Sequence, residues 1–236
     1  MEWTWIGTSW LGTCIKWWRP STVATFSDMP LKRFCSSAIP WASFAILTYA
    51  GTNAPNTDIE GIMLTGFMND QNDEFIVNTL VPAFYPAHMD PKFAGQVAPE
   101  DAYLTTLPGT RLGAYFHAPT ANAAVVAVDE AFKETLAAGI LANPAIMTFV
   151  YDTVLPSAVT APVFVAVGEF DHLFCGVNTD CSNADEVQTL EEAYFSLSSH
   201  VSTQVIRDAG HVLNLQTNAG QTFAKMLDFA DYCVGP

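Results

Sequence analysis

The chain has 236 residues, half of them hydrophobic, and a net charge of −15. This is the composition of a globular protein, and the length is enough for one or two domains with a sizeable core. Nucleic-acid binding draws most of its affinity from clustered lysine and arginine side chains. We therefore expect no nucleic-acid partner.

The opening of the chain differs from the rest. All six tryptophans lie in the first 41 residues, and the first 33 residues carry a net charge of +2 against −17 for the remainder. A secretory signal needs an unbroken apolar run, and polar residues interrupt the apolar stretch at the start of this chain. A membrane span needs about 20 apolar residues, and Lys16 and Arg19 come too early for one. The sequence predicts a poorly ordered, Trp-rich segment over residues 1–42 and no integral membrane span.

The five cysteines are an odd number, so at least one thiol has no partner within the chain. Cys175 and Cys181 flank a turn-rich stretch short enough for a disulfide. A local disulfide, which would favour an oxidising compartment, and two free thiols on one loop both fit this pattern. His172 is the only further ligand that we count nearby, so we expect no metal site and no cofactor.

Hydrophobic periodicity and turn residues divide the chain after residue 42 into helices and strands. Small apolar residues predict a buried helix at 43–53. The run Ile59–Phe67 predicts a strand buried on both faces, as in a parallel sheet. Six prolines over residues 68–120 leave room only for short helices or loops.

The pattern then alternates between helices and strands. The β-branched run Ala161–Gly168 is the clearest strand. The other predicted elements are helices at 122–141 and 145–155, a helix capped by Asn183 or Asp185 that runs to 200, a strand at 201–206 and a closing helix at 213–232. This order is an α/β pattern with parallel crossovers, in which residues 68–155 form an insert between sheet strands.

Two ionisable residues follow neighbouring predicted strands. Asp171 lies three residues after Gly168, and His211 lies five residues after Ile206. Catalytic residues of open α/β sheets lie just past the carboxyl ends of the strands. Asp171 would accept a hydrogen bond from one ring nitrogen of His211 and leave the other nitrogen as a general base. Either residue alone has ordinary roles in turns and caps, so the pair carries the prediction.

The stretches "PVFVAVGEFD" and "VIRDAGHVLNL" resemble the carboxyl-terminal part of an α/β-hydrolase, in which an acid follows the seventh strand and a histidine the eighth. The stretches "DIEGIMLTGF", "DPKFAG", "YLTTLPGTR" and "GEFDHLFCG" are similar to fungal α/β-hydrolase-like proteins. The resemblance covers residues 43–236 and makes 68–155 a cap insert. It implies hydrolysis of a small-molecule ester or amide, with Asp171 as the acid and His211 as the base.

The nucleophile is where the sequence departs from this family. The family places a serine in Gly-x-Ser-x-Gly, at a sharp strand-to-helix turn called the nucleophile elbow. Counting back from the helix predicted at 43–53 puts this elbow at residues 39–43, with Trp41 at its centre. Ser36, Ser37 and Ser43 lack the flanking glycines, so the nucleophile is unknown. Too few residues precede the elbow for five strands and an oxyanion-hole loop. We expect an incomplete α/β-hydrolase-like parallel sheet of about three strands with a mainly helical cap insert.

Three interpretations stay open from the sequence. The first is a hydrolase-like chain that retains the acid and the histidine. The second is a catalytically inactive remnant, a pseudoenzyme or interaction protein, whose exposed first strand would favour self-association through the sheet edge. The third is that residues 1–40 are not the natural start and that the functional protein continues upstream.

Overall fold

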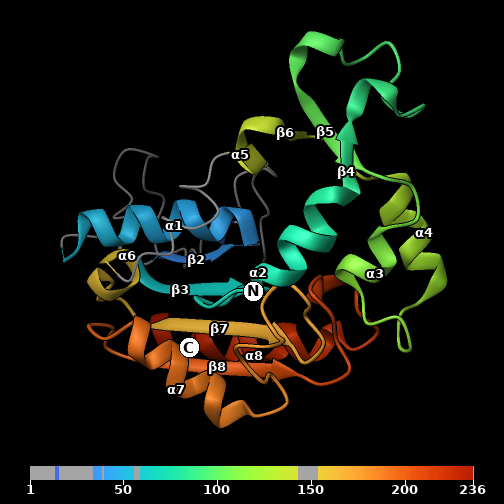
Figure 1. Ribbon diagram of the computed structural model, residues 1–236. Coiled ribbons are helices and arrows are strands. Elements are labelled where there is room, and N and C mark those ends of the chain that lie inside the picture. The colour runs from blue at the N-terminus through green and yellow to red at the C-terminus, as the bar shows by residue number, and fades with distance from the viewer. Residues whose placement is uncertain (1–13, 16–33, 39, 56–58, 143–153, 236) are drawn as a thin grey trace, which may run out of the picture.

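The computed structural model describes residues 14–15, 34–38, 40–55, 59–142 and 154–235 (Figure 1). The predicted lead-in over residues 1–42 therefore falls largely outside the described residues. Its described parts include two strands, β1 (Cys14–Ile15) and β2 (Phe34–Ala38). Both belong to the main sheet, which therefore begins earlier in the chain than residue 43.

Among the described residues, the main sheet has five strands in the order β1-β2-β3-β7-β8. The three predicted strands are present as β3 (Ile59–Thr65), β7 (Val163–Gly168) and β8 (Val201–Ile206). They run parallel to one another and to β2, while β1 is antiparallel. The α/β class and the parallel sheet are thus confirmed.

One edge differs from the prediction. We expected the first strand, now β3, to expose an unpaired edge, but β2 pairs with β3 from Phe34 to Ala38. Pairing removes the open row of N–H and C=O groups that makes an edge prone to aggregation. The five residues of β2 carry a mixed polar and apolar pattern, which is why periodicity did not reveal the strand.

Helices cover both faces of the sheet (Figure 1). On β7, Val163, Val165 and Val167 pack into one core with α1 (Pro40–Asn53) and α7 (Ala184–Tyr194). The alternate residues Phe164 and Ala166 pack into a second core with α8 (Ala219–Val234). The alternation follows from the period of two in a β-strand, whose successive side chains point to opposite faces. Burial on both faces explains the unbroken apolar run of β7.

The remaining helices of the sheet domain follow the predictions with shorter bounds. The side chain of Asn183 caps α7 by accepting from the backbone N–H of Glu186, so one of the two predicted caps is confirmed. The predicted helix at 213–232 divides into a 3₁₀ turn, Leu213–Leu215, and α8. The predicted helix at 145–155 lies mostly outside the described residues, and α6 (Val154–Ala158) includes its last two. No helix among the described residues is long and apolar enough to cross a membrane.

The insert of residues 68–155 has more helix than strand among its described residues, which agrees with the prediction of a mainly helical insert, but it also contains strands that the sequence did not predict. It contains a three-stranded antiparallel sheet of β4 (Phe84–Pro86), β5 (Tyr103–Thr106) and β6 (Leu136–Ala137). Its α-helices are α2 (Asp73–Phe75), α3 (Arg111–Tyr115), α4 (Ala123–Ala131) and α5 (Ala138–Ala142). A π-helical turn at Ile76–Leu80 and 3₁₀ turns at Val81–Ala83, Ala87–Met89 and Pro99–Asp101 connect them.

The helix predicted at 122–141 ends ten residues early, because the chain turns inward after α4. The Lys133 ammonium is buried and lies 2.8 Å from the Asp90 carboxylate and 3.0 Å from that of Glu130. It also donates to the Thr106 carbonyl at 2.7 Å. A buried cation needs such partners, and two of them, Asp90 and Thr106, lie in other segments of the insert. Leu136 then pairs with Leu104 in the small sheet.

Candidate active site

Asp171 and His211 lie together at the carboxyl ends of adjacent parallel strands. The last residues of β7 and β8, Gly168 and Ile206, are register partners, so the two following loops start side by side. The Nδ1 atom of His211 lies 2.9 Å from the Oδ2 atom of Asp171. Asp171 is fully buried and His211 is 7% exposed. The structure thus brings together the two residues that the sequence predicted as a pair.

The turn after β7 fixes the Asp171 carboxylate. Its Oδ1 atom accepts from the backbone N–H of Leu173 at 3.0 Å. The Asp171 carbonyl accepts from the backbone N–H groups of Phe174 at 3.2 Å and Cys175 at 2.7 Å. Both carboxylate oxygens therefore have partners. The bond from Leu173 to Oδ1 holds the carboxylate in the orientation in which Oδ2 faces His211.

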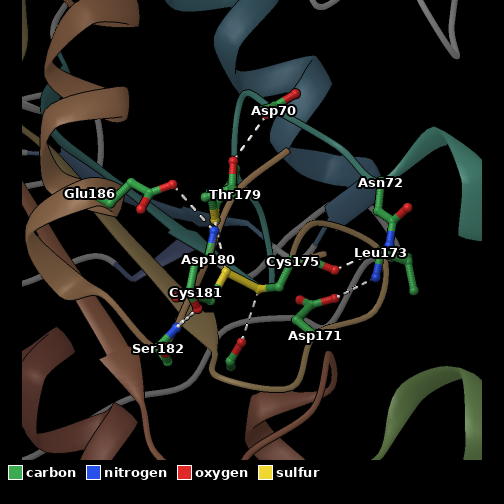
Figure 2. Close-up of a disulfide and its surroundings, with 12 residues drawn as sticks. Asp70, Asn72, Asp171, Leu173, Cys175, Thr179, Asp180, Cys181, Ser182 and Glu186 are labelled. Atoms are coloured by element: carbon green, nitrogen blue, oxygen red, sulfur yellow. Dashed lines mark hydrogen bonds between the residues drawn. A yellow bond between two sulfur atoms is a disulfide. The ribbon is translucent and has the colours of Figure 1, made fainter. Parts of the chain in front are cut away.

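A disulfide between Cys175 and Cys181 closes the loop that follows this turn (Figure 2). Of the two alternatives for these cysteines, the structure contains the disulfide. Asn72, near the start of the insert, donates from its side chain to the Cys175 carbonyl at 3.1 Å and from its backbone to the Leu173 carbonyl at 2.8 Å. The loop that carries Asp171 is thus closed covalently and tied to the insert.

Two glycines allow the His211 loop to approach its neighbours. Gly66 has φ of +59°, and a Cβ atom there would lie 2.6 Å from the His211 carbonyl oxygen. A Cβ atom on Gly210 would lie 2.6 Å from backbone atoms of Phe116 and His117 in the insert. Gly66 has both reasons to be glycine, the missing Cβ and the positive φ, whereas Gly210 has only the close approach of the insert backbone. The sequence predicted Gly66 only as the end of an apolar run and not its close approach to His211.

Two aromatic rings contact the His211 imidazole. The Phe174 ring centroid lies 5.9 Å from that of His211 and the Tyr115 centroid lies 5.8 Å from it. Burial raises the pKa of Tyr115 above its ordinary value. Sequence reasoning missed both residues. Phe174 had a signal, because it follows the predicted acid by three residues, whereas Tyr115 lies in the insert and had none.

The position expected for a nucleophile falls at the junction of β2 and α1. Residue 39 in that junction lies outside the described residues, and α1 begins at Pro40 with Trp41 in its first turn. Ser36 and Ser37 lie in β2, and Ser43 is fully buried in α1. Within the described ranges, no residue forms a hydrogen bond with the Nε2 atom of His211. The described part of the chain therefore assigns no nucleophile.

The described residues contain no cluster of three or more side chains that would hold a metal ion. An open depression of about 480 Å³ lies in the insert between His88 and Asp101. Neither Asp171 nor His211 lines it, so it is separate from the candidate active site.

Comparisons with known proteins bear on the fold. No family model and no curated protein sequence matches the chain. Among solved structures, a thermophilic esterase from Thermogutta terrifontis matches with a TM-score of 0.51 and 16% identity over 85% of this chain. A monoglyceride lipase from Saccharomyces cerevisiae matches with a TM-score of 0.53 and 15% identity over 83% of this chain. A lipase in an open form matches with a TM-score of 0.52 and 14% identity over 89% of this chain. The chain has an α/β-hydrolase fold.

The α/β-hydrolase fold is only partly represented in this chain. The chain spans 66% of the esterase and 60% of the monoglyceride lipase. The resemblance seen in the sequence is thereby confirmed at the level of the fold. Identities of 14–16% carry no further conclusion about chemistry, so the argument for function depends on the site.

Proposed function

We propose that Asp171 and His211 are the acid and the base of a hydrolase that acts on small-molecule esters or amides. The observation that carries the proposal is the 2.9 Å contact between Nδ1 of His211 and Oδ2 of Asp171 at the ends of adjacent parallel strands. An acid–base pair in this arrangement is the part of a hydrolytic triad that moves the proton. The α/β-hydrolase fold, shared with an esterase and a lipase, supports this reaction class.

Each atom of the pair has a role in the proposed reaction. With Nδ1–H donated to Asp171, the lone pair of Nε2 accepts the proton of an attacking hydroxyl as its oxygen bonds to the substrate carbonyl carbon. The buried carboxylate stabilises the imidazolium that forms. His211 then passes the proton to the departing alcohol or amine. Water cleaves the acyl intermediate by the same steps, which regenerates the hydroxyl.

The test needs turnover and a matched control. We expect the purified chain to hydrolyse short-chain p-nitrophenyl esters and to react with a fluorophosphonate probe. His211→Ala removes the base and abolishes both signals, while Asp171→Asn lowers the rate on the order of 10⁴-fold. His200→Ala, which removes an exposed histidine before β8, serves as the control. A folded wild-type sample with neither turnover nor labelling refutes the proposal.

A second candidate is a catalytically inactive protein that uses the fold for binding. The observation that favours it is the sequence Ile39-Pro40-Trp41-Ala42, which carries no hydroxyl between Ala38 and Ser43, where the nucleophile of such a fold belongs. Self-association through a sheet edge belongs to this candidate, and the terminal strands of the sheet are β1 and β8. Gel filtration and circular dichroism, combined with the ester assay, separate the two candidates: a folded, active monomer contradicts the second.

The disulfide supports an oxidising compartment as the place where the protein works, since reducing compartments keep such thiols free. The test is to alkylate free thiols during extraction from the native cells and then to weigh the peptide that contains Cys175 and Cys181. An unmodified, disulfide-linked peptide is the expected product. Alkyl groups on both cysteines contradict the assignment.

A further inference from the structure

The loop that carries the acid also carries an aromatic ring onto the base. We propose that Phe174 is a positioning residue for His211 and that the disulfide-closed loop presents Phe174 and Asp171 to the imidazole as one unit. The inference rests on the proposed function of the Asp171–His211 pair. Nothing in it requires Phe174 to touch a substrate.

Phe174 is placed to restrict the imidazole. Its side chain is 4% exposed, and its ring plane lies 26° from that of His211 at a centroid distance of 5.9 Å. The same ring contacts Phe67, a fully buried residue that follows β3, at 5.7 Å. The Phe174 ring therefore has little freedom to move, because it packs against Phe67 as well as against the His211 imidazole.

The backbone of Phe174 is fixed from both directions along the chain. Its N–H donates to the Asp171 carbonyl, so the ring and the carboxylate leave the same turn. The next residue, Cys175, forms the disulfide with Cys181, and its carbonyl accepts from Asn72 (Figure 2). Opening the loop would therefore release the hydrogen-bond partner and the packing partner of His211 together.

The ring supplies what the single hydrogen bond to Asp171 lacks. One hydrogen bond fixes the direction of Nδ1 but leaves the imidazole plane free to tilt, whereas an offset ring contact restricts the plane. Aromatic pairs of this kind shift an equilibrium by roughly two- to tenfold beyond the effect of buried area. We therefore expect loss of the ring to raise the population of misoriented imidazole by that factor.

The test measures the imidazole directly and does not depend on hydrolysis. In protein labelled with ¹⁵N-histidine, the Nδ1 proton of His211 reports the bond to Asp171, and its exchange with solvent reports how often that bond opens. We expect Phe174→Leu to accelerate this exchange by roughly two- to tenfold. The matched control is Phe164→Leu, which removes an equally buried ring, 4% exposed, that pairs with Phe229 in the other core.

Each outcome decides the proposal. Faster exchange in Phe174→Leu but not in Phe164→Leu supports it, and Cys175→Ser combined with Cys181→Ser shifts the exchange in the same direction. Equal exchange in both leucine variants overturns it, because the effect is then general loosening of the core. If Phe174→Leu does not fold, Phe174→Met, which fills a similar volume without a ring, carries the test. Absence of turnover in the wild type refutes the hydrolase proposal and leaves this measurement intact.

Discussion

A buried carboxylate on α7 makes the stability of the protein depend on pH. Glu191 on α7 is fully buried, and its two oxygens accept from the backbone N–H of Asn69 at 2.8 Å and from the Asn69 side-chain amide at 2.7 Å. Burial, reinforced by the negative charge of Asp70, outweighs these bonds and raises the pKa of Glu191 to about 7. We predict that Glu191→Gln removes a pH-dependent loss of stability.

The size and direction of the effect follow from the two states. Below pH 4.5, the ordinary value for glutamate, the carboxyl group is protonated in both the folded and the unfolded chain. Between 4.5 and about 7 only the unfolded chain releases the proton, so the free energy of unfolding falls as the pH rises. At about 1.4 kcal/mol per pH unit, the complete loss amounts to about 3 kcal/mol above neutral pH.

The glutamine variant avoids this loss because it stays neutral at every pH. Its side-chain oxygen still accepts from the Asn69 backbone. Rotation of the Asn69 amide brings Oδ1, which has no hydrogen-bond partner among the described residues, toward the new Nε2 donor. We therefore expect wild type and Glu191→Gln to unfold with similar free energies near pH 4.5, and the variant to be the more stable by up to about 3 kcal/mol at pH 8.

Urea denaturation followed by circular dichroism at pH 5, 6, 7 and 8 measures the difference. Comparison of two chains at each pH cancels the titration of all other groups. Glu192→Gln removes the exposed neighbouring carboxylate of the same helix and is the control. A constant difference between wild type and Glu191→Gln across this range would refute the reasoning, as would an equal pH dependence in the Glu192 variant.

Two further predictions concern the insert and the histidine loop. Lys133→Met leaves Asp90 buried without its cation and is expected to cost about 3 to 5 kcal/mol in urea denaturation, whereas a loss under about 1 kcal/mol would mean that the pair behaves like an exposed one. Gly210→Ala forces a Cβ atom against the insert backbone and should destabilise the chain by about 1 to 3 kcal/mol. Gly220→Ala, in a helix with open space around it, should stabilise by up to about 1 kcal/mol, so equal effects of the two substitutions would contradict the packing argument.

The three central strands and the proximity of Asp171 to His211 could be predicted because both depend on local signals. The run Val163–Gly168 is apolar at every position, so it reads as a strand buried on both faces wherever it lies. Parallel crossovers are short and of one hand, which places the ends of successive strands side by side. Those two rules were enough to bring Asp171 and His211 together from the sequence.

Features that depend on a distant partner could not be predicted in this way. Periodicity predicted one helix over 122–141, including Lys133. Nothing in the local sequence pattern indicates that the Lys133 ammonium is buried against Asp90. The strand β2 has little apolar pattern of its own, and it is a strand because β3 offers it a row of unpaired backbone groups.

The sequence by itself determined the fold class, the central strands and the pair Asp171 and His211 that the structure brings together. Only the tertiary structure decided which partners the buried polar groups find. Glu191 lies on a helix rich in acids, which the sequence presents as a solvated face, yet it bonds to Asn69, which is 122 residues away. Periodicity shows which face of a helix or strand is apolar. A buried polar contact joins two single residues that are far apart in the chain, so it leaves no repeating pattern from which it could be predicted.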